Sequence, residues 1–203
     1  MNPEIIPVFP TPIYRTKLNK KLDKKELLFI EKTKTDCHAN EGNLTSNNSY
    51  ILNNKTFKNL KKEINLIIKD YVNKIILPQE NLIFEITQSW LNYTETNQYH
   101  HKHQHPNSLI SGVLYINCNE KFDKITFFKS EYNTIRVTPK SWNWFNSSSW
   151  WVSVKTGDII LFPSSLTHMV ETKEGDNTRI SLAFNVFVKG RIGDKKQLTE
   201  LYL

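Results

Sequence analysis

The chain has few cysteines and no long apolar run, and both features exclude some classes of protein. Its 203 residues include two cysteines, Cys37 and Cys118, which lack the paired spacing of a zinc site or a disulfide framework. We therefore expect two reduced thiols. No apolar run approaches the roughly 18 residues of a membrane span, and the first residues lack the basic and apolar regions of a secretory signal. We expect a soluble, cytoplasmic protein without a membrane partner.

Arginine is also scarce, since only four of the 27 basic residues are arginines. Acidic residues number 20. The resulting net charge of +7 could steer the protein toward nucleic acid. Abundant lysine together with abundant asparagine is, however, also what an AT-biased coding sequence produces. A hydrophobic content of 38% is enough for a folded core. The length fits a single domain spanning residues 1–203.

Residues 1–80 predict a lead-in strand followed by two helices. Pro7, Pro10 and Pro12 favour an extended start. Asp23 and Glu26 form a capping-box pattern that predicts the first helix. Residues 36–53, rich in Asn and Ser, predict a loop. Residues 54–76 have apolar side chains at three- and four-residue steps and predict a second helix, which Pro78 ends.

Residues 81–190 predict a β core, and residues 191–203 a C-terminal tail. Short β-like runs separated by turn residues occur at 82–93, 109–117, 124–128, 133–138, 150–154, 158–162, 167–172 and 178–188. No helical period survives between them. The fold class is therefore mainly β (α+β), an antiparallel barrel or sandwich with two N-terminal helices on one face.

Four histidines crowd together just before one predicted strand, at positions 100, 101, 103 and 105. On a strand, residues i and i+2 point to the same face, so an H-x-H pair can direct two imidazoles at one metal ion. The alternative is a surface cluster that binds nothing.

His168 follows a predicted strand, and Arg179 begins another after the turn signal at 174–177. If these strands pair as a hairpin, His168 and Arg179 lie nearly opposite each other. A lone histidine is usually structural. A third imidazole beside a guanidinium nevertheless suggests a metal ion together with an anion.

Several blocks together resemble a known family. They are Val8-Phe-Pro-Thr-Pro-Ile-Tyr14, Trp90-Leu-Asn92, His103-Gln-His-Pro-Asn-Ser108 with Ser111-Gly-Val-Leu-Tyr115, Gly157-Asp-Ile-Ile-Leu-Phe-Pro-Ser-Ser-Leu-Thr-His168, and Arg179-Ile-Ser-Leu-Ala-Phe-Asn185. Their order resembles the putative 2-oxoglutarate/iron(II) oxygenase family common in phages and bacteria. The resemblance implies a double-stranded β-helix, which is a jelly-roll or cupin-like fold, and the host cytoplasm as location if a phage encodes the chain.

The resemblance also implies roles for individual residues. His103, His105 and His168 would bind iron(II) and form the catalytic centre. Arg179, with Ser181 beside it, would bind the distal carboxylate of 2-oxoglutarate, and Tyr115 and Asn92 would line the cosubstrate pocket. The reaction would use O2 to hydroxylate a C–H bond and would release succinate and CO2.

One departure from the superfamily leaves alternatives open. His105 stands where the general pattern has a carboxylate, so the site resembles three-histidine cupin enzymes that use no 2-oxoglutarate. The histidine register is also open, because His101 with His103, or His105 with Asn107, has the same spacing. A non-catalytic β-barrel binding module is a third possibility.

The segment 140–151 contains four of the five tryptophans. Its rings could pack on the sheet as part of a hairpin. They could instead form a lip over the active site that stacks on a flat substrate. The sequence does not choose among small-molecule, sugar, peptide and nucleic-acid substrates, and it does not indicate an oligomeric state.

Overall fold

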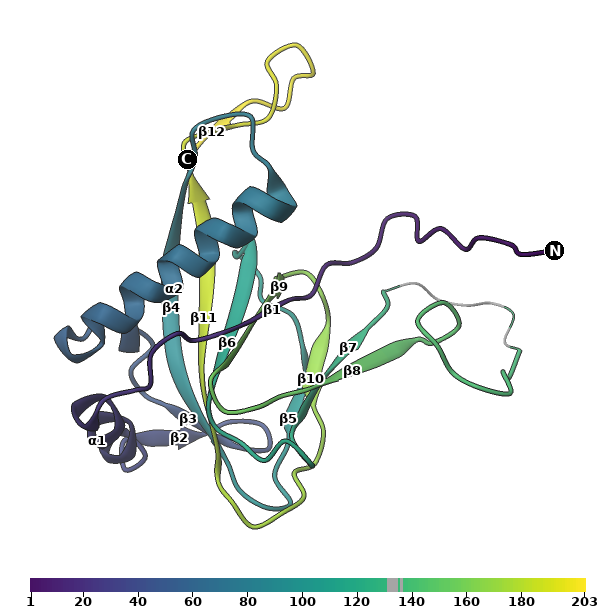
Figure 1. Cartoon of the computed structure of the whole chain (residues 1–203). Helices are drawn as coiled ribbons and strands as arrows, with labels where there is room; N and C mark the ends of the chain where they lie inside the picture. Colours follow the sequence, from purple (N-terminus) through teal and green to yellow (C-terminus); the bar gives the residue numbers. More distant parts are fainter. Residues whose placement is uncertain (131–134, 136) are drawn as a thin grey trace.

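Two antiparallel sheets form the centre of the molecule, and the computed structural model describes residues 1–130, 135 and 137–203 (Figure 1). The larger sheet has the order β1 (Tyr14–Lys17), β9 (Asp158–Pro163), β6 (Ile110–Asn117), β11 (Arg179–Lys189), β4 (Ile83–Thr94), β3 (Leu44–Ser46) and β2 (Cys37–Ala39). The smaller sheet has the order β5 (His100–His103), β10 (His168–Val170), β7 (Lys124–Phe128) and β8 (Ser149–Ser153). The predicted mainly-β class is confirmed.

Alternation along the strands of the larger sheet separates a cavity face from a core face. On β11, Arg179 and Ser181 line a cavity between the two sheets, whereas Leu182 joins the hydrophobic core on the other side. Gly112 of β6 lets the sheet pack tightly, since a Cβ there would lie 2.2 Å from the Phe184 ring. The sheet thus carries polar groups on one face and core residues on the other.

Both predicted helices pack against the core face of the larger sheet. Helix α1 (Lys24–Thr33) begins at Asp23 with the predicted capping box, and the Tyr93 hydroxyl of β4 donates to the carbonyl oxygen of Ile30. Helix α2 (Lys58–Tyr71) lies across β4, β11 and β6 (Figure 1). A 3-10 turn (Lys55–Phe57) precedes α2 and a π turn (Val72–Ile76) follows it, which matches the predicted range 54–76.

The predicted loop at 36–53 is wrong in part. It contains the hairpin β2–β3 and a 3-10 turn (Ile51–Asn53). Strands of three residues are too short to show an alternating pattern, and β3 is stabilised by pairing with β4, where Thr45 lies opposite Asn92. The sequence also missed β5, because a run of histidines and lysine has no β-branched residues.

Three smaller predictions have different outcomes. The predicted strand 133–138 lies largely outside the described residues, and Ile135, Val137 and Thr138 are not in a strand. The tail 191–203 forms a small hairpin of β12 (Arg191–Ile192) and β13 (Leu201–Tyr202). Cys37 and Cys118 are both free, as expected.

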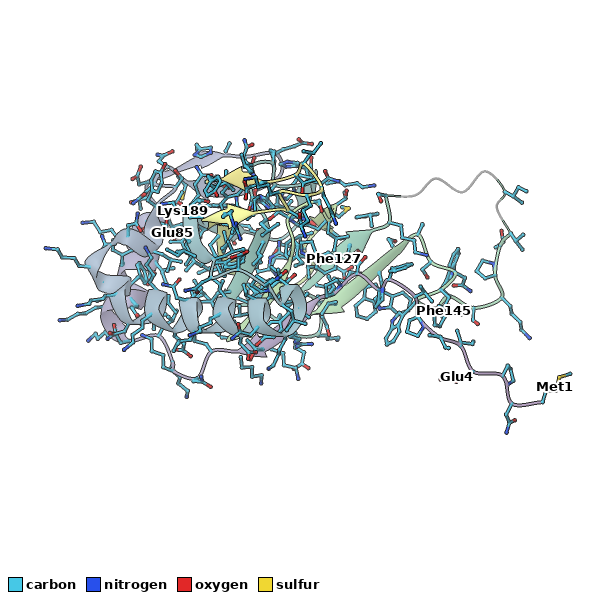
Figure 2. All side chains as sticks on the ribbon, turned by 90° about the horizontal axis from the view of Figure 1, so that it is seen from above. Met1, Glu4, Glu85, Phe127, Phe145 and Lys189 are labelled. Carbon is cyan, nitrogen blue, oxygen red and sulfur yellow. The ribbon has the colours of Figure 1, made fainter. Side chains whose placement is uncertain are left out.

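The β7–β8 hairpin and the N-terminal segment project from the body on the same side. Figure 2 shows Phe145, Met1 and Glu4 well away from Glu85 and Lys189, which form an ion pair on the body. The tryptophans of segment 140–151 are exposed, and Trp144 is 73% exposed. The segment ends in the hairpin that one alternative expected, with Trp150 and Trp151 on β8, but its tryptophan rings are not buried on the sheet. Within the described ranges, no helix has the length and apolar character needed to cross a membrane.

Candidate active site

Three histidines from two segments meet in the cavity between the sheets. His168 on β10 is the direct strand partner of His103 on β5, and His105 follows β5 by two residues. The His105 backbone N–H donates to the carbonyl oxygen of Ser164 at 3.0 Å, which fixes that segment beside the end of β9. One ring nitrogen from each of the three histidines lies within 4.8 Å of the others. This spacing allows all three nitrogens to face one metal ion.

Hydrogen bonds select the ring nitrogen that two of the three histidines, His103 and His168, present to the cavity. Nδ1 of His103 lies 2.8 Å from the carbonyl oxygen of His101, and Nδ1 of His168 lies 3.0 Å from that of Leu166. A carbonyl can only accept, so each Nδ1 carries the proton and each Nε2 keeps its lone pair. This arrangement is typical of metal-binding histidines, whose second nitrogen is oriented by a backbone acceptor.

Burial keeps these imidazoles neutral. Burial, the larger cause, and the neighbouring His103 together lower the pKa of His168 to about 3 and that of His105 to about 4. Burial likewise lowers the pKa of His103. Neutral imidazole is the form that binds metal, so protons compete weakly for these nitrogens at neutral pH.

Among the described residues, one guanidinium, that of Arg179, lines the same cavity. The Arg179 side chain is 4% exposed, and its Nη1 lies 3.5 Å from Oδ1 of Asp123, which is 1% exposed. Burial lowers the pKa of Arg179, while Tyr115 and Asp123 oppose this shift. A guanidinium has five N–H donors, so the one long contact with Asp123 leaves donors for an anion in the cavity.

Polar side chains form a row beside Arg179 on the larger sheet. Ser181 lies opposite Asn92 on β4 and opposite Tyr115 on β6, and all three line the cavity. Burial raises the pKa of Tyr115, so its hydroxyl stays protonated and can donate a hydrogen bond. The structure therefore brings together every residue for which the sequence suggested a role in metal or cosubstrate binding.

The predicted hairpin between His168 and Arg179 is wrong. β10 pairs with β5 and β7 in the smaller sheet, whereas β11 pairs with β4 and β6 in the larger one. Contacts of Lys173 explain why the chain passes from the smaller sheet to the larger one between β10 and β11. The Lys173 backbone pairs with Asn97 and Gln98, and its Nζ donates to backbone oxygens of the following loop. The two residues reach one cavity from facing sheets rather than from neighbouring strands.

Sequence reasoning gave no role to two residues near Arg179, although it counted one of them, His100, in the histidine cluster. Asp123, in the turn before β7, accepts from the Asn119 backbone N–H at 2.7 Å and also contacts Arg179. His100 lines the cavity, and the Arg179 charge is among the influences that lower its pKa, with burial the largest. Asp123 had no sequence signal, because it lies among ordinary turn residues.

The donor set of the cavity fits a first-row transition metal. Imidazole nitrogens suit iron and zinc. Among the residues that the structure describes, no carboxylate lines this cavity. The predicted lip also differs, since no described residue of segment 140–151 lines the cavity.

The comparisons with known proteins agree with this geometry. Residues 88–185 match the sequence model of a family described as "Putative 2OG-Fe(II) oxygenase". No curated protein matches the chain. The matched range contains all seven residues that were assigned metal or cosubstrate roles from the sequence.

Solved structures share the fold at low sequence identity. HygX from Streptomyces hygroscopicus, crystallised with nickel, 2-oxoglutarate and hygromycin B, is 12% identical with a TM-score of 0.58, over 87% of this chain and 82% of that one. A prolyl-4-hydroxylase from Pseudomonas putida is 12% identical with a TM-score of 0.56, over 86% and 92%. The epimerase SnoN from nogalamycin biosynthesis is 9% identical with a TM-score of 0.63, over 87% and 76%. The fold is the double-stranded β-helix that these structures share.

Proposed function

We propose that this chain, whose residues 88–185 match the putative 2OG-Fe(II) oxygenase family, is an iron(II)- and 2-oxoglutarate-dependent dioxygenase that hydroxylates a C–H bond. The observation that carries this proposal is the cavity itself. Three imidazole nitrogens gather at one place in it, and a buried guanidinium lines the same space.

In this proposal His103, His105 and His168 hold iron(II). Nε2 of His103 and His168 is oriented by the bond that each Nδ1 donates. Three neutral ligands place no negative charge on the metal, so the carboxylates of 2-oxoglutarate supply the balancing charge. Bound iron supplies the oxidising chemistry with O2, and the protein supplies positions and a cavity shielded from water.

Arg179 and Ser181 anchor the distal carboxylate of 2-oxoglutarate. The guanidinium offers a planar pair of donors, and the Ser181 hydroxyl lies on the same strand face. Tyr115 and Asn92 flank Ser181 and narrow this end of the cavity. Asp123 holds the guanidinium in place while remaining outside the cavity lining.

The substrate reaches the site from a neighbouring groove. Trp90 and His105 line both the histidine cavity and this groove, so the groove meets the cavity at the metal site. Its other lining includes Tyr50 and several neutral amide and hydroxyl side chains, namely Thr45, Asn47, Gln88, Asn107 and Asn185. No Asp, Glu, Lys or Arg of the described residues lines it. We infer an uncharged, hydrogen-bonding substrate with a flat face that stacks on an aromatic ring.

Succinate formation tests the proposal. Protein supplied with iron(II), 2-oxoglutarate, O2 and ascorbate, a reductant that supplies the two electrons the missing substrate would give, should slowly convert 2-oxoglutarate to succinate and CO2. His168→Ala should abolish this turnover, whereas Trp144→Ala, on the projecting hairpin, should leave it unchanged. Iron binding without any succinate would favour a three-histidine enzyme that does not use 2-oxoglutarate.

A further inference from the structure

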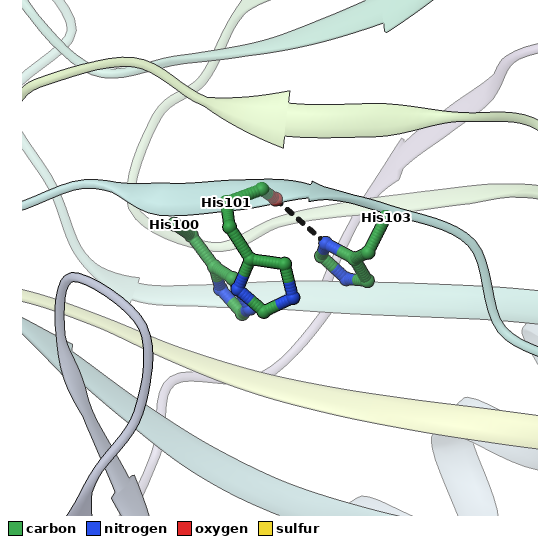
Figure 3. A group of neighbouring side chains, drawn as sticks. All are labelled: His100, His101 and His103. Carbon is green, nitrogen blue, oxygen red and sulfur yellow. Dashed lines mark hydrogen bonds between the residues drawn. The ribbon is translucent and has the colours of Figure 1, made fainter.

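Strand β5 carries a second group of three histidines beside the first. One ring nitrogen from each of His100, His101 and His103 lies within 4.8 Å of the others (Figure 3). The His100 and His103 rings stack at 4.6 Å with an interplanar angle of 17°, and the His100 and His101 rings are 5.2 Å apart. His100 and His101 do not belong to the group formed by His103, His105 and His168.

A β-bulge explains how neighbouring residues reach the same side. His168 lies opposite His103 and Val170 lies opposite His100, so Met169 alone faces both His101 and Lys102. In a regular strand His100 and His101 would point to opposite faces. A bulge breaks that alternation and turns a side chain, and bulges of this kind are common next to active sites.

The His101 ring also has a buried nitrogen without a partner. Its Nδ1 has no hydrogen bond within the described part of the chain. The nearest carboxylate oxygen, from Glu41, lies 3.9 Å away, which is too far for a hydrogen bond. Because an unpaired buried nitrogen is unfavourable, this atom points to a ligand. Imidazole groups select ions such as Zn²⁺, Co²⁺ and Ni²⁺ over Mg²⁺ and Ca²⁺.

We propose that His100, His101 and His103 form a second cation site that takes a borderline transition-metal ion. His103 is common to both groups, and its Nδ1 already donates to the carbonyl oxygen of His101. Its Nε2 can bind only one ion. The two sites are therefore alternatives, and this consequence, unlike the site itself, rests on the proposed function. An ion at the second site removes His103 from the catalytic group.

Cobalt(II) titration of the full-length chain tests the site, because histidine-bound Co²⁺ has a visible absorption spectrum. The variant His105→Ala/His168→Ala removes two ligands of the catalytic group and keeps the second site intact. It should bind one equivalent of Co²⁺. Adding His101→Gln to this variant should weaken binding by about tenfold or more, a change of about 1.4 kcal/mol. His38→Gln, which removes an exposed histidine outside both groups, should leave the affinity unchanged.

Other outcomes would overturn the site. A folded double variant that binds no Co²⁺, or an affinity unaffected by His101→Gln, contradicts it. Circular dichroism checks folding, and His105→Gln/His168→Gln replaces the double variant if the alanines unfold the chain. His101→Gln in the otherwise natural chain should preserve 2-oxoglutarate binding with iron(II). Failure of 2-oxoglutarate binding in the natural chain would instead contradict the proposed function.

Discussion

Replacing Arg179 is the most informative single change, because this side chain is the proposed anchor for 2-oxoglutarate and is also buried against Asp123. The two side chains are 4% and 1% exposed. Breaking a buried charge pair costs about 3–5 kcal/mol of stability. Because the two side chains are 3.5 Å apart and Asp123 keeps its hydrogen bond from the Asn119 backbone, Arg179→Ala should lower the free energy of unfolding by about 3 kcal/mol, near the lower end of this range.

The effect on cosubstrate binding is separate from this loss of stability. Removing one partner of a buried charged hydrogen-bonded pair weakens binding by about 2–5 kcal/mol, which is roughly thirty- to several-thousand-fold. Arg179→Lys keeps the charge but loses the planar pair of donors, so its affinity should fall between those of Arg179→Ala and the natural chain.

Calorimetric titration of 2-oxoglutarate into the iron(II)-loaded protein without oxygen measures these affinities, and urea unfolding measures the stabilities. Arg15→Ala is the matched control, because Arg15 is 37% exposed, pairs with the buried Asp158, and neither residue lines the cavity that holds Arg179. It should leave the 2-oxoglutarate affinity unchanged. An equally unchanged affinity in folded Arg179→Ala would refute the anchoring role.

Three further predictions concern pH, packing and substrate. The metal-free protein should lose stability as the pH falls below about 6.5, because an unfolded histidine gains a proton there. Burial lowers the pKa values of His168 and His105 to about 3 and about 4, so the folded chain does not gain that proton until the pH is much lower. The loss of stability should reach about 2 kcal/mol per histidine at pH 5 and disappear above pH 7. The urea unfolding midpoint of His105→Ala/His168→Ala should therefore depend less on pH than that of the natural chain. An equal pH dependence of the two midpoints would contradict this. Gly112→Ala places a Cβ 2.2 Å from the Phe184 ring and should destabilise by about 1–3 kcal/mol; an unchanged urea midpoint would show that the sheet can relax. Once a substrate is found, Trp90→Ala should raise its KM about tenfold or more through lost stacking, whereas Trp144→Ala should not, and the opposite pattern would place the substrate on the projecting hairpin.

Much of the site could be predicted from the sequence because its chemistry lies in short local patterns. Each candidate site residue could be recognised from a few neighbouring residues. The patterns are the H-x-H spacing, a histidine after a predicted strand, and an arginine in a predicted strand. The capping box at Asp23 and the periodic helix over 54–76 were likewise local, and both are confirmed.

The remaining features depended on contacts between distant segments. Asp123 touches Arg179 from 56 positions away, and nothing near Asp123 in the sequence indicates this. The expected hairpin between His168 and Arg179 failed because Lys173 pairs with Asn97 and Gln98. The bulge in β5 follows from pairing with β10, so the second histidine group was visible only as an ambiguity of register.

The central claim is that His103, His105 and His168 hold iron(II) while Arg179 holds 2-oxoglutarate in the same cavity. Adding 2-oxoglutarate to the iron(II)-loaded protein without oxygen, and following the visible metal-to-ligand charge-transfer band, tests both halves together. The account predicts a band that saturates in the natural chain and is absent in His168→Ala. Iron(II) binding without any band in the natural chain would contradict it.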